Sequence, residues 1–198
     1  MPAPCRKDDP ELKELSKQYL ADLAKKASHD EQAFEQLYNI FFPKIYQYIY
    51  HRVNSKEITE DLVSDIFLKV VRNLPSLKNP EDIKSWTFSI AKNSLIDHYR
   101  KAGRKKEDSS EAVSDDLTFQ TETPEDSLLD QEHSQEILSA LNILSEEQQE
   151  VIQLRFIHEL KIKEIASVMN KSEGAIKGLL YRGLNKLSKH MEFKEVRS

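Results

Sequence analysis

Apolar residues recur every three or four positions through the first half of the chain, which is the period of an amphipathic helix. Residues 11–53 fit this pattern, with a break near residues 28–30 where Ser28 or Asp30 can cap the next helix. The apolar stripe of that next helix comprises Phe34, Leu37, Tyr38, Phe41, Ile45, Tyr48 and Ile49. We therefore expect two consecutive helices whose apolar sides face a core.

Two further helices are expected before residue 103. Ser55 is a suitable N-cap for a helix that ends before Pro75 and buries one apolar face. The members of that face are Leu62, Val63, Ile66, Phe67, Val70 and Leu74, which leaves Leu68 on the opposite side. The second of these helices, near Trp86, has apolar residues on two sides and should lie between other helices. Trp86 could stack on a nucleotide base, but tryptophan at such a position is more often core.

A second group of helices follows residues 103–126, which have no period and are rich in acidic and hydroxyl side chains. Residues 127–144 are amphipathic, and Ser145 with Gln148 forms a capping-box pattern. A helix ending at Asn170 and another capped by Ser172 leave a turn of three or four residues, typical of a helix-turn-helix. The last helix should turn one face inward: Ile176, Leu180, Gly183, Leu184 and Leu187. Its opposite face would carry Gly174, Gly178, Tyr181, Arg182 and Asn185.

Composition supports an all-α fold made of two small helical bundles joined by a flexible acidic linker. The 198 residues are 38% hydrophobic and 32% charged, with only four Gly and seven Pro. Cys5 is the sole cysteine, so an internal disulfide or a thiolate zinc site is excluded. The sequence has no run of about 18 apolar residues and no signal-peptide core. We therefore expect a cytoplasmic protein that does not insert into a membrane.

The charges are strongly segregated although the net charge is −5. Residues 84–106 contain seven Lys or Arg and one Asp, and residues 161–194 contain eight basic and three acidic residues. Residues 107–136 contain eleven acidic residues and no basic one. Clustered Lys and Arg are what phosphate binding requires, so two basic blocks are candidates for nucleic-acid contacts.

The order of these segments resembles bacterial RNA polymerase sigma factors of the extracytoplasmic-function (ECF) type. "EDLVSDIFLKV" resembles the polymerase-binding helix of that family, and "SWTFSIAKNSLIDHYRK" resembles its promoter-melting helix. Residues 144–187 are similar to its minus-35 reader. The resemblance implies an N-terminal extension (1–27), a region-2-like domain (28–102), a linker (103–127), a region-4-like domain (128–192) and a tail (193–198).

The resemblance implies roles for residues of the first domain. A base flipped from the minus-10 element would enter a pocket formed by Asn73, Leu77, Lys78, Ile90 and Asn93, with Asn93 the strongest candidate. Its phosphates would be held by Lys84, Lys92, Arg100, Lys101 and Arg104. The polymerase would dock on the exposed face of Asp61, Asp65, Leu68 and Arg72.

In the second domain, the implied minus-35 contacts are Lys171, Ser172, Lys177, Tyr181, Arg182 and Lys186. The chain departs from the usual family pattern at Ala175, Gly178 and Leu179, where threonine, serine and arginine are usual. We expect a changed minus-35 preference, since losing one arginine can remove a contact worth about 1–3 kcal/mol.

The expected partners are core RNA polymerase, through the clamp helices of its largest subunit and its flap, promoter DNA, and an anti-sigma factor. The acidic linker could mimic a DNA strand inside the polymerase or only keep the basic blocks apart. We expect no cofactor, metal or catalytic activity, because the six histidines are scattered and no phosphate loop or nucleophile motif occurs. The alternatives are a conventional helix-turn-helix regulator and a helical adaptor that binds only proteins.

Overall fold

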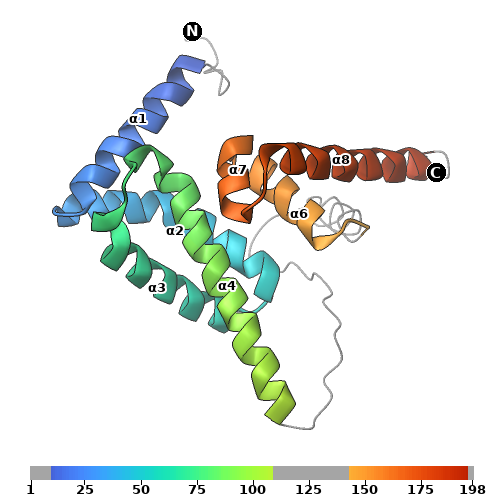
Figure 1. Ribbon diagram of the computed structural model, residues 1–198, viewed down its shortest axis with the longest axis horizontal. Coiled ribbons are helices and arrows are strands. Elements are labelled where there is room, and N and C mark those ends of the chain that lie inside the picture. Colours follow the sequence, from blue (N-terminus) through green and yellow to red (C-terminus); the bar gives the residue numbers. More distant parts are fainter. Residues whose placement is uncertain (1–9, 109–142, 196–198) are drawn as a thin grey trace. The chain divides into compact units, whose positions relative to one another are not determined.

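The computed structural model describes residues 10–108 and 143–195, and within these ranges the chain forms helices and no strand. It divides into two compact units, Met1–Ser109 and Ser110–Ser198. Figure 1 shows α1 to α4 in the first unit and α6 to α8 in the second. The predicted all-α class is therefore confirmed for the described residues.

The first two helices are α1 (Pro10–Ala27) and α2 (Glu31–Val53). Asp30, rather than Ser28, is the N-cap of α2: its Oδ1 accepts hydrogen bonds from the amides of Gln32 (2.9 Å) and Ala33 (3.3 Å). The helix ends where Asn54 adopts the left-handed conformation, with φ of 45°. Ser55 then caps α3 (Lys56–Asn73), as predicted.

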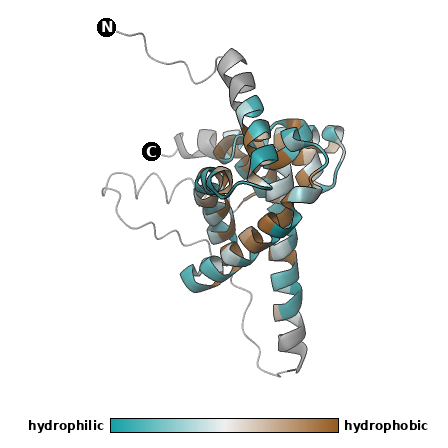
Figure 2. Cartoon of the chain, turned by 90° about the vertical axis from the view of Figure 1, so that its left-hand side faces the viewer, coloured by the Kyte–Doolittle hydropathy of each residue, from teal (hydrophilic) through white to brown (hydrophobic). Residues whose placement is uncertain are grey.

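A short connection leads from α3 into α4 (Ile83–Asp108) through two 3-10 turns, η1 (Leu74–Ser76) and η2 (Pro80–Asp82). The predicted apolar face of α3 is buried, and so are Phe88, Ala91 and Leu95 of α4. Tyr48 of α2 packs edge-on against Phe88, with ring centroids 5.4 Å apart. Figure 2 shows hydrophobic and hydrophilic residues alternating along the helices, as expected for amphipathic helices.

The second unit contains α6 (Glu146–Ile152), a π-helical turn η3 (Gln153–Ile157), α7 (Ile162–Met169) and α8 (Glu173–Glu195). The predicted capping box is present: the Gln148 amide donates to Ser145 Oγ (3.4 Å), and the Ser145 amide donates to Gln148 Oε1 (3.2 Å). The core includes Val151, Leu154, Leu160, Ile165 and Ile176.

Four expectations need correction. Leu179 is only 8% exposed and so belongs to the core face of α8, whereas Leu184, expected inside, is 40% exposed. Trp86 is only partly buried and is not a core residue. The helix α4 continues to Asp108, past residue 103 where the linker was expected to begin. The remaining linker and most of the predicted helix 127–144 lie outside the described residues.

Candidate nucleic-acid interfaces

The candidate minus-10 pocket is built around the connection between α3 and α4. Asn73 is the last residue of α3, and its Nδ2 donates to the carbonyl of Lys69 one turn earlier (2.8 Å). Leu77 is half-buried, and Lys78 is exposed. On α4, Ile90 is half-buried, and Asn93 is exposed. Asn73 and Asn93 are thus both at the surface, and the amide of Asn73 already gives one hydrogen bond to its own helix.

A hydrogen bond between helices holds the two sides of this pocket together. Lys69 Nζ of α3 donates to Ser94 Oγ of α4 at 2.8 Å. Lys69 lies one helical turn before Asn73, and Ser94 is next to Asn93 in the sequence, so the bond joins α3 and α4 close to both candidate positions along the helices. The sequence analysis did not select Lys69. Its partner is 25 residues away in the sequence, so no local pattern pointed to this contact.

The basic residues of α4 are distributed along its length. Lys84 and Lys92 are half-buried, while Arg100 and Lys101 are exposed. Arg100 pairs with Asp97 on the same helix, with 3.3 Å between Nη1 and Oδ1. An exposed pair of this kind is weak, about 0–1 kcal/mol, so the guanidinium can exchange its partner for a phosphate. The Arg104 side chain lies outside the described residues.

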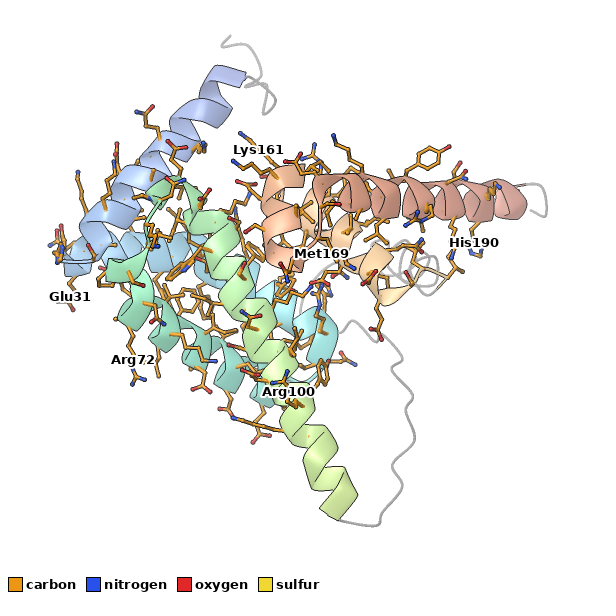
Figure 3. All side chains as sticks on the ribbon, viewed as in Figure 1. Glu31, Arg72, Arg100, Lys161, Met169 and His190 are labelled. Atoms are coloured by element: carbon orange, nitrogen blue, oxygen red, sulfur yellow. The ribbon has the colours of Figure 1, made fainter. Side chains whose placement is uncertain are left out.

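The candidate polymerase face of α3 is exposed as predicted. Leu68 is 53% exposed, and its expected neighbours Asp61, Asp65 and Arg72 are all exposed. Figure 3 shows Arg72 pointing outward from α3. The structure adds Val71, which is 48% exposed and widens the apolar centre of this face.

An aromatic row on α2 was also missed as a separate feature. It comprises Tyr38, Phe42, Tyr46 and Tyr50, which are spaced four residues apart and half-buried. Consecutive rings lie 5.2, 5.9 and 6.1 Å apart between centroids, and Tyr38 contacts Phe67 of α3 at 4.6 Å. Burial, with smaller contributions from Glu60 and Tyr50, raises the pKa of Tyr46 above 10.0, so this phenol stays neutral. The i, i+4 spacing was the available signal.

The helix-turn-helix is held by caps on both sides of its turn. Asn170 takes the left-handed conformation at the end of α7, with φ of 51°, and Ser172 Oγ accepts the Ala175 amide of α8 at 3.2 Å. Lys171, a predicted DNA contact, forms an ion pair with Glu147 of α6 (2.8 Å). Its ammonium is therefore directed toward α6 in the free protein.

The exposed side of α8 carries the other predicted minus-35 residues. Lys177, Arg182 and Lys186 are exposed, and Tyr181 is 71% exposed. A Cβ at Gly178 would lie 3.5 Å from Arg182 Nη1, so the guanidinium lies along the helix over the glycine one turn earlier. Leu179 is on the buried side, and an arginine at this position could not reach DNA without leaving the core face. The expected loss of a base contact at residue 179 is therefore not supported by the structure.

The second unit also exposes apolar side chains that the sequence analysis did not select. Phe156 and Ile157, at the end of the π-helical turn, are 57% and 44% exposed. Arg155 Nη1 donates to the carbonyl of Leu160 (2.9 Å), and Glu159 adopts a left-handed conformation with φ of 54°. A rigid turn thus presents two adjacent apolar residues at the surface.

Within the described residues there is neither a metal-binding cluster nor a membrane-spanning helix. In these parts of the chain, no three His, Cys, Asp or Glu side chains come together as a metal site. None of the helices described is both long and apolar enough to cross a bilayer.

Comparison with known proteins identifies the class. Residues 37–105 match the family description "Sigma-70 region 2", and residues 134–187 match "Sigma-70, region 4". These two regions define a transcription protein of the sigma-70 class.

Individual relatives narrow the class to one family. The chain is 34% identical to ECF RNA polymerase sigma factor BldN of Streptomyces coelicolor over 86% of its length, and it spans 65% of that protein. It is 31% identical to ECF RNA polymerase sigma factor SigX of Bacillus subtilis, with 82% of this chain and 85% of the relative covered. The chain therefore belongs to the ECF RNA polymerase sigma factors, which direct transcription initiation and are regulatory rather than catalytic.

Two solved structures share the fold. The structure of CnrH in complex with the cytosolic domain of CnrY has a TM-score of 0.64 at 23% identity, covering 87% of this chain and 97% of that one. RpoE in complex with the anti-sigma factor NepR, from Bartonella quintana, has a TM-score of 0.65 at 24% identity, covering 80% and 96%.

Proposed function

We propose that the two units divide promoter recognition between them. The first unit captures an unpaired minus-10 base, and the second reads the minus-35 duplex through α8. The observation that carries this proposal is the placement of Asn93 and Arg182: each is exposed, and each belongs to a unit with its own core. Burial of these two residues in one shared core would have contradicted it.

The minus-10 function rests on chemistry of the α3–α4 surface. The amides of Asn73 and Asn93 can donate to and accept from a base edge, and Leu77 and Ile90 offer apolar contact to its ring. Flipping a base costs a few kcal/mol, which these contacts must supply together. The partly exposed Trp86, four residues before Ile90 on α4, is placed to add stacking, worth about 1–3 kcal/mol per base. The lysines and arginines of α4 would hold the adjoining phosphates.

The minus-35 function rests on α8 as a recognition helix in the major groove. Arg182 and Lys177 supply donors for guanine or phosphate oxygens, and Tyr181 is 71% exposed beside them. Ser172 caps the N-terminus of α8, where backbone N–H groups face a phosphate. Lys171 would contact DNA after exchanging its Glu147 partner for a phosphate.

Protein partners would use the apolar surfaces of each unit. The face of Asp61, Asp65, Leu68 and Arg72 would dock the clamp helices of the polymerase largest subunit, with Leu68 as the apolar anchor. The flap would bind the second unit. An anti-sigma factor would compete for these surfaces, by analogy with the complexes of CnrH with CnrY and of RpoE with NepR.

Three further points of the proposal are where the protein acts, whether it is catalytic and what the acidic segment does. We propose that the protein works in the cytoplasm, where its polymerase partner acts, and that it has no catalytic activity of its own. The acidic segment between the units would either mimic a DNA strand within the polymerase or serve as a spacer.

Run-off transcription with purified core polymerase tests this function. Templates are drawn from a genomic promoter library, and each is transcribed with and without the protein. Transcripts that require the protein are expected. Their absence across the library would contradict the proposal. Tight binding of palindromic duplexes without polymerase would instead favour a conventional regulator.

A further inference from the structure

The connection between α3 and α4 is held on its outer side by α1. Lys17 Nζ of α1 lies 2.6 Å from Glu81 Oε2 of η2, and this ion pair joins positions 64 residues apart. The side chains are 33% and 57% exposed, so the pair is partly shielded on the lysine side. In Figure 1 the α3–α4 connection lies beside α1.

Small side chains on α1 allow it to pack closely against neighbouring parts of the first unit. Ala21, Ala24 and Ala27 are buried at intervals of three residues along α1. Ala21 lines a shallow cavity of about 190 Å³ together with Pro80 and the Lys17–Glu81 pair. Lys25, which also lines the cavity, pairs with Asp22 on its own helix at 3.6 Å. The two lysines of the lining are thus balanced by two carboxylates, which does not favour anion binding. The cavity is a gap in the packing between α1 and the α3–α4 connection.

The connection itself consists of two short turns joined by extended residues. The Leu77 amide donates to the Leu74 carbonyl, and the Asp82 amide donates to the Asn79 carbonyl, each at 3.0 Å. Leu77 and Asn79 have extended backbones, with ψ of 105° and 101°. Each turn is therefore fixed internally, but Leu77, Lys78 and Asn79 can reorient if the second turn moves. The contact of η2 with α1 limits that movement.

We propose that α1 is a brace that sets the position of Leu77 and Lys78 for base capture, with Lys17 and Glu81 as its positioning residues. This inference rests on the proposed minus-10 function. The ion pair keeps η2 against α1, which holds the two residues at the edge of the pocket formed with Asn73 and Asn93. Loosening the pair lets the connection sample other positions, so a smaller fraction of molecules is ready to hold the flipped base.

A charge-swap series in the polymerase holoenzyme tests the brace. The variants are Lys17→Glu, Glu81→Lys and the double variant with both changes. Strand opening on a promoter identified by run-off transcription is measured by permanganate reactivity of unpaired thymines. Each single variant should open about two- to fivefold less promoter, the range expected for one partly exposed ion pair. The double variant should recover opening, because the pair is restored with reversed polarity.

Lys25→Glu is the matched control. It makes the same charge change on the same helix and lines the same cavity, but its partner Asp22 is on α1 itself. Its opening should equal that of the wild-type protein. Protection of the minus-35 duplex by α8 should be unchanged in all four variants. Single variants that open like the wild type, or a double variant no better than the singles, would overturn the brace.

Asn93→Ala separates this proposal from the function on which it rests. If Asn93→Ala opens the promoter normally, the minus-10 pocket is wrong, and the brace falls with it. If Asn93→Ala abolishes opening while Lys17→Glu and Glu81→Lys have no effect, only the brace is wrong. The thermal unfolding midpoint of each variant is also measured. If a single variant opens less promoter at an unchanged midpoint, and the double variant recovers opening, the ion pair acts by positioning Leu77 and Lys78. A loss that merely parallels a lowered midpoint overturns it.

Discussion

Replacing Gly178 by alanine should stabilise α8 and weaken promoter binding. Glycine inside a helix costs about 0.8–1.0 kcal/mol relative to alanine. A Cβ at residue 178 would meet only the guanidinium of Arg182, at 3.5 Å for the nearest atom, which is an ordinary contact. The substitution should therefore stabilise α8 by nearly the full propensity difference, since nothing rigid opposes the new methyl group.

Gly183→Ala is the matched control on the same helix. Its propensity gain is the same, but the new Cβ would lie 2.9 Å from the Ile152 δ-methyl group. That side chain must move, and an off-rotamer position costs about 0.5–1.5 kcal/mol. The two effects nearly cancel, so the expected net change is close to zero.

Amide hydrogen exchange of the full-length protein, read by mass spectrometry on α8 peptides, measures both variants. A gain of about 0.8–1.0 kcal/mol corresponds to about four- to fivefold slower exchange for Gly178→Ala. Little change is expected for Gly183→Ala. Faster exchange in Gly178→Ala, or equal gains in both variants, would refute this reading of the contacts.

The same variant tests why a stability cost is tolerated at residue 178. We expect Gly178→Ala to bind promoter duplex more weakly, because the methyl group adds bulk to the side of α8 that is proposed to face the DNA. The affinity is measured by fluorescence anisotropy on a minus-35 duplex with the holoenzyme. If Gly178→Ala binds as tightly as the wild-type protein, close approach of DNA to α8 is not the reason for the glycine.

Three further substitutions test the first unit. Leu68→Asp should weaken binding to core polymerase by at least about tenfold in an anisotropy titration, with a stability change within about 0.5 kcal/mol, because the side chain is exposed; unchanged affinity would remove Leu68 from the docking face. Tyr99→Phe deletes the 2.6 Å hydrogen bond to the Arg52 carbonyl and should cost about 0.5–1.5 kcal/mol in urea unfolding followed by Trp86 fluorescence; no loss would mean that water replaces the hydroxyl. Burial, and to a smaller extent the charge of Arg52, lower the pKa of His51 below 6.5 in the folded protein. As the pH drops below 6.5, His51 therefore takes up a proton more readily in the unfolded chain than in the folded one, and the free energy of unfolding should fall. His51→Gln should flatten that decrease in urea titrations at several pH values, and an unaltered slope would assign it to other groups.

The local rules of helix formation predicted much of the fold. Asp30, Ser55, Ser145 and Ser172 were recognised as possible caps because their short polar side chains precede apolar periodic stretches, and all four cap a helix in the structure. The exposed position of Leu68 followed from the same periodicity. These features depend on neighbours within a few residues.

The errors arose where tertiary packing decides. On α8, Leu179 and Leu184 are both apolar, and periodicity alone could not show that α6 packs on the side of Gly183 and Leu179. The end of α4 was misplaced because residues 103–126 were assigned to the linker as one stretch, from their composition and lack of period, although the charged helix formers after Gly103 continue the helix to Asp108. Lys69–Ser94 and Lys17–Glu81 join distant positions and leave no periodic signal.

The division of labour between the units is tested most directly by comparing Asn93→Ala with Arg182→Ala in the polymerase holoenzyme on one promoter. Strand opening and minus-35 protection are recorded on the same samples. We expect Asn93→Ala to keep the minus-35 protection while losing permanganate reactivity. We expect Arg182→Ala to lose more of the minus-35 protection than of the permanganate reactivity. If both variants lose both signals equally, or neither variant loses either, the two units do not divide promoter recognition as proposed.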